Sequence, residues 1–181
     1  MIGKLLRRLV LTAAALPALM LTSELPALAS PPEPVDPIAI DLPADTACPG
    51  FALRLQQSEG NLHLKTFTDR NGNPVKAIQA GKGFLLTYTN IGPDSENPVP
   101  GKSVSIRSNG SVSKTTYNSD GTQTVSATGH NGLILFPTDV PAGPSTTQYV
   151  GRIVYTIAAD QTFTLVSTTG QERNICAELA N

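Results

Sequence analysis

The best candidate for metal chemistry in this chain is the loop sequence Asp69-Arg70-Asn71-Gly72-Asn73. Asp69, Asn71 and Asn73 place carboxylate and amide oxygens at alternate positions, and such oxygens can converge on a calcium ion. In the helical calcium loop a glycine follows the third ligand and an acidic residue closes the site, whereas here Pro74 follows and the closing glutamate is missing. An Asn-Gly turn between two strands uses the same residues. The sequence therefore favours a structural turn and leaves calcium as the one candidate cofactor.

Paired carboxylates are the second candidate chemistry, because six acidic residues fall in predicted loops that could meet in space. They are Asp69, Asp94, Glu96, Asp120, Asp139 and Asp160. A hydrolase or lyase would need two of them at catalytic separation. Aspartates are also common in turns, where the carboxylate accepts hydrogen bonds from nearby backbone amides. We therefore favour the structural role and assign no catalytic residue.

Histidine and nucleophile motifs give no stronger candidate. His63 and His130 are the only histidines, and they lack the short local spacing of zinc ligands. The stretch Ser111-Val112-Ser113-Lys114 matches Ser-x-x-Lys by letters only, because it falls in a predicted strand and the accompanying motifs are missing. The chain also has no tryptophan on which a sugar ring could stack. These observations favour a protein that binds rather than catalyses.

The two cysteines predict a disulfide. Cys48 and Cys176 lie near the two ends of the region that has strand-like patterns, and the chain has no third thiol to compete. In an exported protein such a pair forms a bridge. We expect it to tie the start of the sheet to its end.

The N-terminus has the pattern of an export signal over residues 1–29. Lys4, Arg7 and Arg8 form a basic region, Leu9 to Leu21 an apolar core, and Ala27-Leu28-Ala29 a small-x-small cleavage site. An uncleaved membrane anchor is the alternative, but the apolar core is shorter than the roughly 20 residues that span a bilayer. We therefore expect a secreted, extracellular protein whose mature chain has no transmembrane segment.

The charge of the mature chain limits its partners. Without residues 1–29 it holds 10 basic and 13 acidic residues, a net charge of about −3. The basic residues are scattered singly along the sequence, which is not the pattern of a nucleic-acid or anionic-membrane surface. We expect no nucleic-acid partner, and an unknown extracellular ligand or envelope component instead.

The rest of the chain divides into two parts. Residues 30–47 form a proline-rich leader that we expect to lack fixed structure. Residues 48–181 form a single domain of short runs with alternating apolar residues, which indicate strands. Only Ile175 to Ala180 suggests a helix. The predicted strands are Phe51 to Gln56, the run around Leu62 and Leu64, Val75 to Ala80, Phe84 to Thr89, the run around Val104 and Ile106, Ser111 to Tyr117, Thr122 to Thr128, Leu133 to Phe136, Tyr149 to Ala158 and Thr162 to Ser167.

This pattern predicts an all-β fold, an antiparallel β-sandwich or barrel of about nine to ten strands with a short C-terminal helix. Asn109-Gly110 has the composition of a two-residue hairpin turn and predicts that the strands on either side pair with each other.

Several short motifs resemble a group of small secreted β-rich proteins common in actinobacteria, which keep one cysteine before the first strand and one after the last. The resemblance spans Ala47 to Ala180, is of moderate specificity, and implies export and an all-β fold but no activity. Its motifs are Ala47-Cys48-Pro49-Gly50-Phe51, Thr89-Asn90, Gly101-Lys102-Ser103-Val104, Asp120-Gly121-Thr122, Thr128-Gly129-His130-Asn131 and Ile175-Cys176-Ala177.

The function hypothesis from the sequence is a non-catalytic extracellular or envelope-associated binding or structural module. A hydrolase or lyase that uses loop carboxylates is one alternative. A secreted enzyme inhibitor is another, with a proline-stiffened loop at Gly92 to Pro100 or Pro137 to Pro144 presented to the enzyme.

Overall fold

The computed structural model describes residues 31–180, which form fourteen strands and one short helix. The strands are β1 (Glu33–Pro34), β2 (Ala39–Leu42), β3 (Leu53–Ser58), β4 (Asn61–Thr68), β5 (Pro74–Lys82), β6 (Leu85–Asn90), β7 (Ser103–Arg107), β8 (Val112–Tyr117), β9 (Gln123–Thr128), β10 (His130–Leu135), β11 (Ser145–Val150), β12 (Ile153–Ile157), β13 (Phe163–Thr168) and β14 (Gln171–Asn174), and the helix is α1 (Ile175–Ala180). The predicted all-β class and the C-terminal helix are confirmed.

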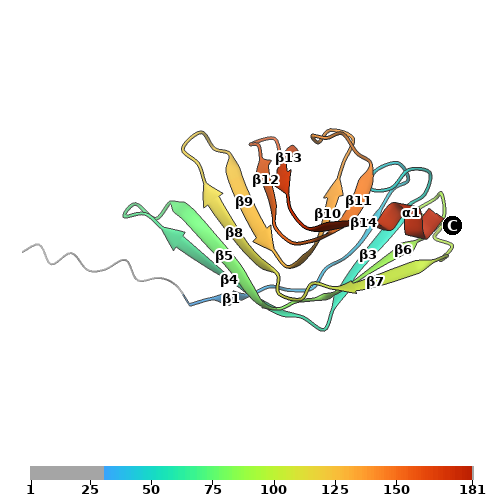
Figure 1. The fold of residues 1–181 in the computed structure, drawn as a ribbon, viewed down its shortest axis with the longest axis horizontal. Coiled ribbons are helices and arrows are strands. Elements are labelled where there is room, and N and C mark those ends of the chain that lie inside the picture. The colour runs from blue at the N-terminus through green and yellow to red at the C-terminus, as the bar shows by residue number, and fades with distance from the viewer. Residues whose placement is uncertain (1–30, 181) are drawn as a thin grey trace, which may run out of the picture.

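The strands form three sheets, all with antiparallel pairing (Figure 1). The largest has seven strands in the order β1-β4-β5-β8-β9-β12-β13, the second has four in the order β2-β3-β6-β7, and the third has three in the order β10-β11-β14. Within residues 31–180 each sheet stays open, so the barrel form of the prediction is wrong.

The three-stranded sheet lies between the other two sheets. The evidence is that neighbouring apolar side chains of β10 enter two different cores. Ile134 on β10 packs into a core formed by the four-stranded sheet and α1. Its neighbours Leu133 and Leu135 point the other way, into a second core with Ile153 and other residues of β9, β12 and β13. One short strand thus joins two cores, because successive side chains of β10 point to opposite faces of the sheet.

The segment from β1 to β2, residues 33–42, connects the edges of the two larger sheets, and we call it the crossing segment. β1 pairs with β4 at the edge of the seven-stranded sheet, and β2 pairs with β3 at the edge of the four-stranded sheet. The prediction that residues 30–47 lack fixed structure therefore fails for the described part. Edge strands tolerate proline because one side of the strand needs no partner, and the alternation Ala39-Ile40-Asp41-Leu42 is a short strand pattern.

The predicted disulfide is confirmed, although it joins different elements from those expected. Cys48 lies in the loop before β3 and Cys176 lies in α1, with 5.4 Å between their Cα atoms. The buried Thr146 of β11 packs against this bridge. Its backbone N–H donates to Cys176 Sγ, and its hydroxyl donates to the carbonyl of Ala47 at 2.9 Å. The bridge therefore anchors the first loop and the helix to the three-stranded sheet.

The strand count and one turn also depart from the predictions. The single strand expected from Tyr149 to Ala158 is two strands, because Gly151 has φ of +144° and breaks the ladder. β14 was not predicted, since all four of its residues are polar and exposed. The Asn109-Gly110 turn does not form a hairpin. β7 pairs only with β6, and β8 pairs with β5 and β9, so this turn moves the chain from one sheet to another.

The predicted export signal, residues 1–29, lies outside the described residues. The one helix among residues 31–180 has six residues, so this part of the chain contains no helix long and apolar enough to cross a membrane.

Candidate functional site

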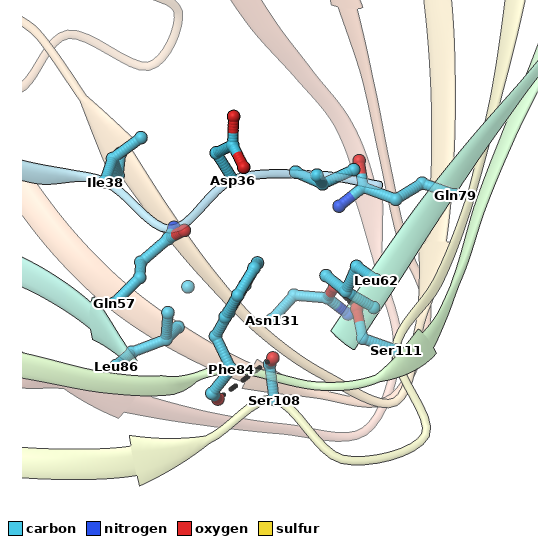
Figure 2. Close-up of a pocket in the computed structure, with 12 residues that line it drawn as sticks. Asp36, Ile38, Gln57, Leu62, Gln79, Phe84, Leu86, Ser108, Ser111 and Asn131 are labelled. Atoms are coloured by element: carbon cyan, nitrogen blue, oxygen red, sulfur yellow. Dashed lines mark hydrogen bonds between the residues drawn. The ribbon is translucent and has the colours of Figure 1, made fainter. Parts of the chain in front are cut away.

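Two adjoining pockets form a groove between the crossing segment and the sheets. Their volumes are about 350 and 310 Å³, and both are lined by Ile38, Gln57, Leu86 and Gly132. Figure 2 shows the first pocket, with Asp36 and Ile38 of the crossing segment on one side and Phe84 and Leu86 on the other. The second pocket continues along the inner face of the four-stranded sheet. We call the two pockets together the groove, and its size is within the range of small-molecule sites.

The side chain of Phe84 is a fixed wall of the first pocket. Its ring packs so closely on Gly60 that a Cβ there would lie 2.0 Å from the Phe84 Cδ1 atom. The Phe84 carbonyl accepts hydrogen bonds from the backbone N–H and the hydroxyl of Ser108, at 2.9 and 3.2 Å. The glycine makes room for the ring and the serine holds its backbone, so this part of the groove is formed before any ligand binds.

Tyr88 supplies the most unusual polar group of the groove. Its residue is 1% exposed, yet no described residue offers its hydroxyl a hydrogen-bond partner. Burial raises the pKa of Tyr88 to about 12, so the hydroxyl stays protonated. Tyr88 lines the second pocket, and a Cβ at Gly132 would lie 2.1 Å from the Tyr88 hydroxyl oxygen. The hydroxyl thus lies beside the glycine that both pockets share.

The remaining polar lining of the groove is almost neutral. The side-chain amides of Gln57 and Gln79 have no hydrogen-bond partner within residues 31–180, whereas Asn131 accepts from the Ser111 hydroxyl and donates to a backbone carbonyl. Asp36 is the one acidic residue that lines either pocket, and Figure 2 shows its carboxylate pointing away from Phe84. The groove therefore presents apolar surface with a few neutral hydrogen-bonding groups.

The calcium candidate lies in the turn between β4 and β5, away from the groove. One Asp69 carboxylate oxygen accepts from the backbone N–H groups of Asn71 and Asn73 at 2.8 and 2.9 Å, and the other accepts from the Asn73 amide at 3.1 Å. These bonds, first of all the Asn73 side-chain bond, lower the pKa of Asp69. Asp69, Asn71 and Asn73 do come together, but they do so through hydrogen bonds of one turn, in which Asp69 is the acceptor and the two asparagines are the donors. Calcium binding there stays a prediction.

Three more of the loop carboxylates are also bonded within their own turns. Asp94 accepts from Asn97 and Glu96, Asp120 from Thr122, and Asp160 from Thr162. These bonds lower the pKa of each aspartate. Such bonding is the structural role of turn aspartates.

Asp139 differs from the turn aspartates because it is buried. Its two carboxylate oxygens accept from the backbone N–H groups of Phe136 and Phe163, at 2.6 and 2.8 Å. It therefore ties the loop after β10 to the start of β13. The part of the chain that the structure describes holds no cluster of three or more histidine, cysteine or acidic side chains placed for a metal.

The two histidines lie in separate places. His130 begins β10, where its Nδ1 atom is 3.3 Å from the Gln148 amide nitrogen. His63 lies on β4, on the same face as Lys65 and Phe67 and opposite to the groove residue Leu62. The contacts of the two histidines assign neither of them a function.

The groove has no signature in the sequence. Its residues come from the crossing segment and from strands of all three sheets, so no local spacing links them. Tyr88 falls within the predicted strand Phe84 to Thr89, and the residue is buried. Only the structure shows that the Tyr88 hydroxyl has no hydrogen-bond partner among the described residues.

No protein-family model matches this chain, and no curated protein or solved structure matches it.

Proposed function

We propose that this protein is a secreted, non-catalytic binding module whose groove takes a neutral, elongated molecule with an apolar body and one hydrogen-bond acceptor. The carrying observation is the Tyr88 hydroxyl, which has no hydrogen-bond partner among the described residues and belongs to a residue that lines an otherwise apolar groove. The secreted location rests on the sequence of residues 1–29 and on the disulfide, a bond typical of oxidising compartments.

A hydrogen bond from the Tyr88 hydroxyl to a ligand would add to the affinity of the groove. The hydroxyl has no partner among the described residues, so a bond to a ligand would replace only a bond to water. Such an exchange contributes about 0.5–1.5 kcal/mol. Ligand sites commonly combine an apolar lining with a few polar groups that fix the orientation of the ligand.

The charge of the lining supports a neutral ligand. An anionic ligand would need a cation to replace its water, but the lining of the groove contains no lysine or arginine. The free amides of Gln57 and Gln79 can bond to carbonyl or hydroxyl groups of a ligand. Apolar contact then comes from the crossing segment, where Ile38 is 49% exposed and Ile40 is 44% exposed.

The test is a displacement assay with the neutral fluorophore N-phenyl-1-naphthylamine, whose emission rises in an apolar site. The chain has no tryptophan, which keeps the protein's own emission low. We expect the fluorophore to bind and to be displaced by 2-nonanone, which carries a ketone acceptor, and by n-nonane, which does not. Tyr88→Phe should weaken 2-nonanone binding about fivefold, the value of one hydrogen bond, and leave n-nonane unchanged.

A matched control is Tyr117→Phe, which removes a hydroxyl from β8 outside the lining of both pockets. It should leave both affinities unchanged. Failure of the fluorophore to bind would overturn the groove as a ligand site. Equal effects of Tyr88→Phe on ketone and alkane would overturn the role of the hydroxyl.

A further inference from the structure

The seven-stranded sheet gathers basic residues that the sequence keeps apart. Three arginines elsewhere in the described chain are neutralised by carboxylates, in the pairs Arg54–Asp41, Arg107–Glu59 and Arg173–Glu178. Lys65, Lys76, Lys114 and Arg152 have no such carboxylate partner within residues 31–180. Strand pairing places all four on one face of the seven-stranded sheet, and we call this the basic face.

The first row of the basic face crosses four strands. Lys65 of β4 is opposite Ile78 of β5. Ile78 is in turn opposite Lys114 of β8, and Lys114 is opposite Ser126 of β9. Residues directly opposite each other in an antiparallel sheet point to the same side. Arg152 joins this row, because its Nε donates to the Ser126 hydroxyl at 3.1 Å. Lys65 and Lys114 are two strands apart, which is about 10 Å.

The next row adds the fourth cation and an aromatic ring. Phe67 of β4 is opposite Lys76 of β5. The Lys65 and Lys76 ammonium groups lie 5.3 and 5.6 Å from the centre of the Phe67 ring. Both lysines therefore share one side of the sheet with the ring, and cation–π attraction holds them near it.

Acidic side chains do not interrupt this face. Among the strands of the seven-stranded sheet the only acidic residue is Glu33, which is opposite Leu64 and so lies on the other side. The aspartates of the hairpin turns, Asp69, Asp120 and Asp160, lie beyond the strand ends, where each accepts hydrogen bonds from its own turn. The other positions of the face are largely hydroxyl residues, including Thr116, Thr124, Ser126 and Thr156.

We propose that the basic face binds an acidic polysaccharide, a partner separate from the ligand of the groove. Cations about 10 Å apart on one face of a sheet suit carboxylate groups repeated along an extended polymer. The threonine and serine hydroxyls between the cations can bond to sugar hydroxyls. The groove and the basic face lie on opposite sides of the same strands, because Leu62 and Gln79 line the groove while their neighbours His63 and Ile78 point the other way.

The same residues are poorly suited to other polyanions. Single-stranded nucleic acids need several aromatic rings on which bases stack, and this face offers one, Phe67, beside which two lysines already lie. A membrane surface would favour protruding apolar residues among the cations. The large apolar residues exposed on this face are the short side chains of Val112 on β8, at 43%, and of Val166 at the bulge of the edge strand β13, at 59%.

The test is binding of the refolded or secreted full chain to polygalacturonate, with neutral dextran of the same length as the uncharged probe. We expect binding to polygalacturonate alone, weakened by added salt because surface charges are screened. Lys114→Glu reverses an exposed charge in the middle of the row and should weaken binding at least about fivefold.

The matched control is Lys102→Glu, which makes the same change in net charge at an exposed lysine just before β7, whose Nζ lies 3.5 Å from the Glu178 carbonyl oxygen. It should change binding less than about twofold. Arg152→Gln gives a second variant of the basic face. Equal weakening by Lys114→Glu and Lys102→Glu would show a general charge effect and overturn the proposal. Tighter binding to single-stranded DNA or to vesicles of anionic phospholipid than to polygalacturonate would also overturn it.

Discussion

The hydroxyl of Tyr88 fills the space in which a side chain at position 132 would lie, since a Cβ on Gly132 would come within 2.1 Å of the hydroxyl oxygen. The two residues come from different sheets, β6 and β10, and both line the groove. The absence of a side chain at Gly132 therefore permits the four-stranded and three-stranded sheets to approach at this point.

Gly132→Ala should displace the Tyr88 ring and disturb the junction of the two pockets. We expect a loss of about 1–3 kcal/mol in the free energy of unfolding, the usual cost of overpacking, together with weaker binding of N-phenyl-1-naphthylamine. Urea unfolding and fluorescence titration measure the two effects. Gly101→Ala is the control, because a Cβ at Gly101 would lie 3.4 Å from its nearest neighbour, the Asn90 carbonyl oxygen. This variant should change neither the free energy of unfolding nor the binding of the fluorophore. Wild-type stability and binding in Gly132→Ala would contradict the close approach.

Removal of the disulfide should lower stability more than any single surface change. The bridge joins residues 128 positions apart, and removal of a native disulfide from a small domain typically costs about 2–5 kcal/mol. The double variant Cys48→Ser with Cys176→Ser avoids a free thiol. We expect it to unfold at a lower urea concentration, matching the wild-type protein under reducing conditions. An unchanged midpoint would show that the buried contacts of Thr146 and the helix hold this region without the bridge.

Stability should fall in acid because of the turn aspartates. Hydrogen bonds in the folded turns lower the pKa of Asp69, Asp94, Asp120 and Asp160 below 3.8. A lowered folded pKa stabilises the protein above the unfolded value, and this contribution is lost as the pH falls through the folded pKa. We expect a constant melting temperature from neutral pH to about pH 5 and a decline below about pH 4.

The control for this pH dependence is the fourfold Asp→Asn variant at these positions, measured by circular dichroism over the same range. Its melting temperature should be lower near neutral pH and should depend less on acid. The arginine-bound carboxylates, such as Glu178, also have lowered pKa values and will leave a residual acid dependence. A wild-type melting temperature that is flat or rises toward about pH 2.5 would contradict the assignment.

The strands that could be predicted are those with a marked apolar alternation. β6 overlaps the predicted strand Phe84 to Thr89, and it lies between β3 and β7. The helix Ile175–Ala180 was predicted with its observed bounds, and its apolar residues Ile175, Cys176 and Leu179 are buried. β14 was missed because all of its residues are exposed, so the strand needs no apolar residue. Its backbone pairing with β11 does not depend on the type of side chain and therefore cannot be predicted from composition.

The arrangement of the sheets could not be predicted, because it depends on contacts between distant segments. Asn109-Gly110 has hairpin composition, but Ser108 N–H bonds to the Phe84 carbonyl while β8 pairs with β5, so the chain changes sheets there. The basic face has the same origin. Lys65 and Lys114 are far apart in the chain and come together only through the pairing of β4 and β8 with β5.

The position of Cys48 along the chain has one more consequence. The covalent ring closed with Cys176 begins after the crossing segment, so the stretch that forms one side of the groove lies outside that ring. A protease cut between Leu42 and Cys48 would leave the ring intact. That stretch would then be held by noncovalent contacts, which are the backbone pairing with β3 and β4, the Arg54–Asp41 ion pair and the packing of Val35 and Leu42 on the core. Of the two sides of the groove, one is thus covalently locked and the other could be shed or replaced.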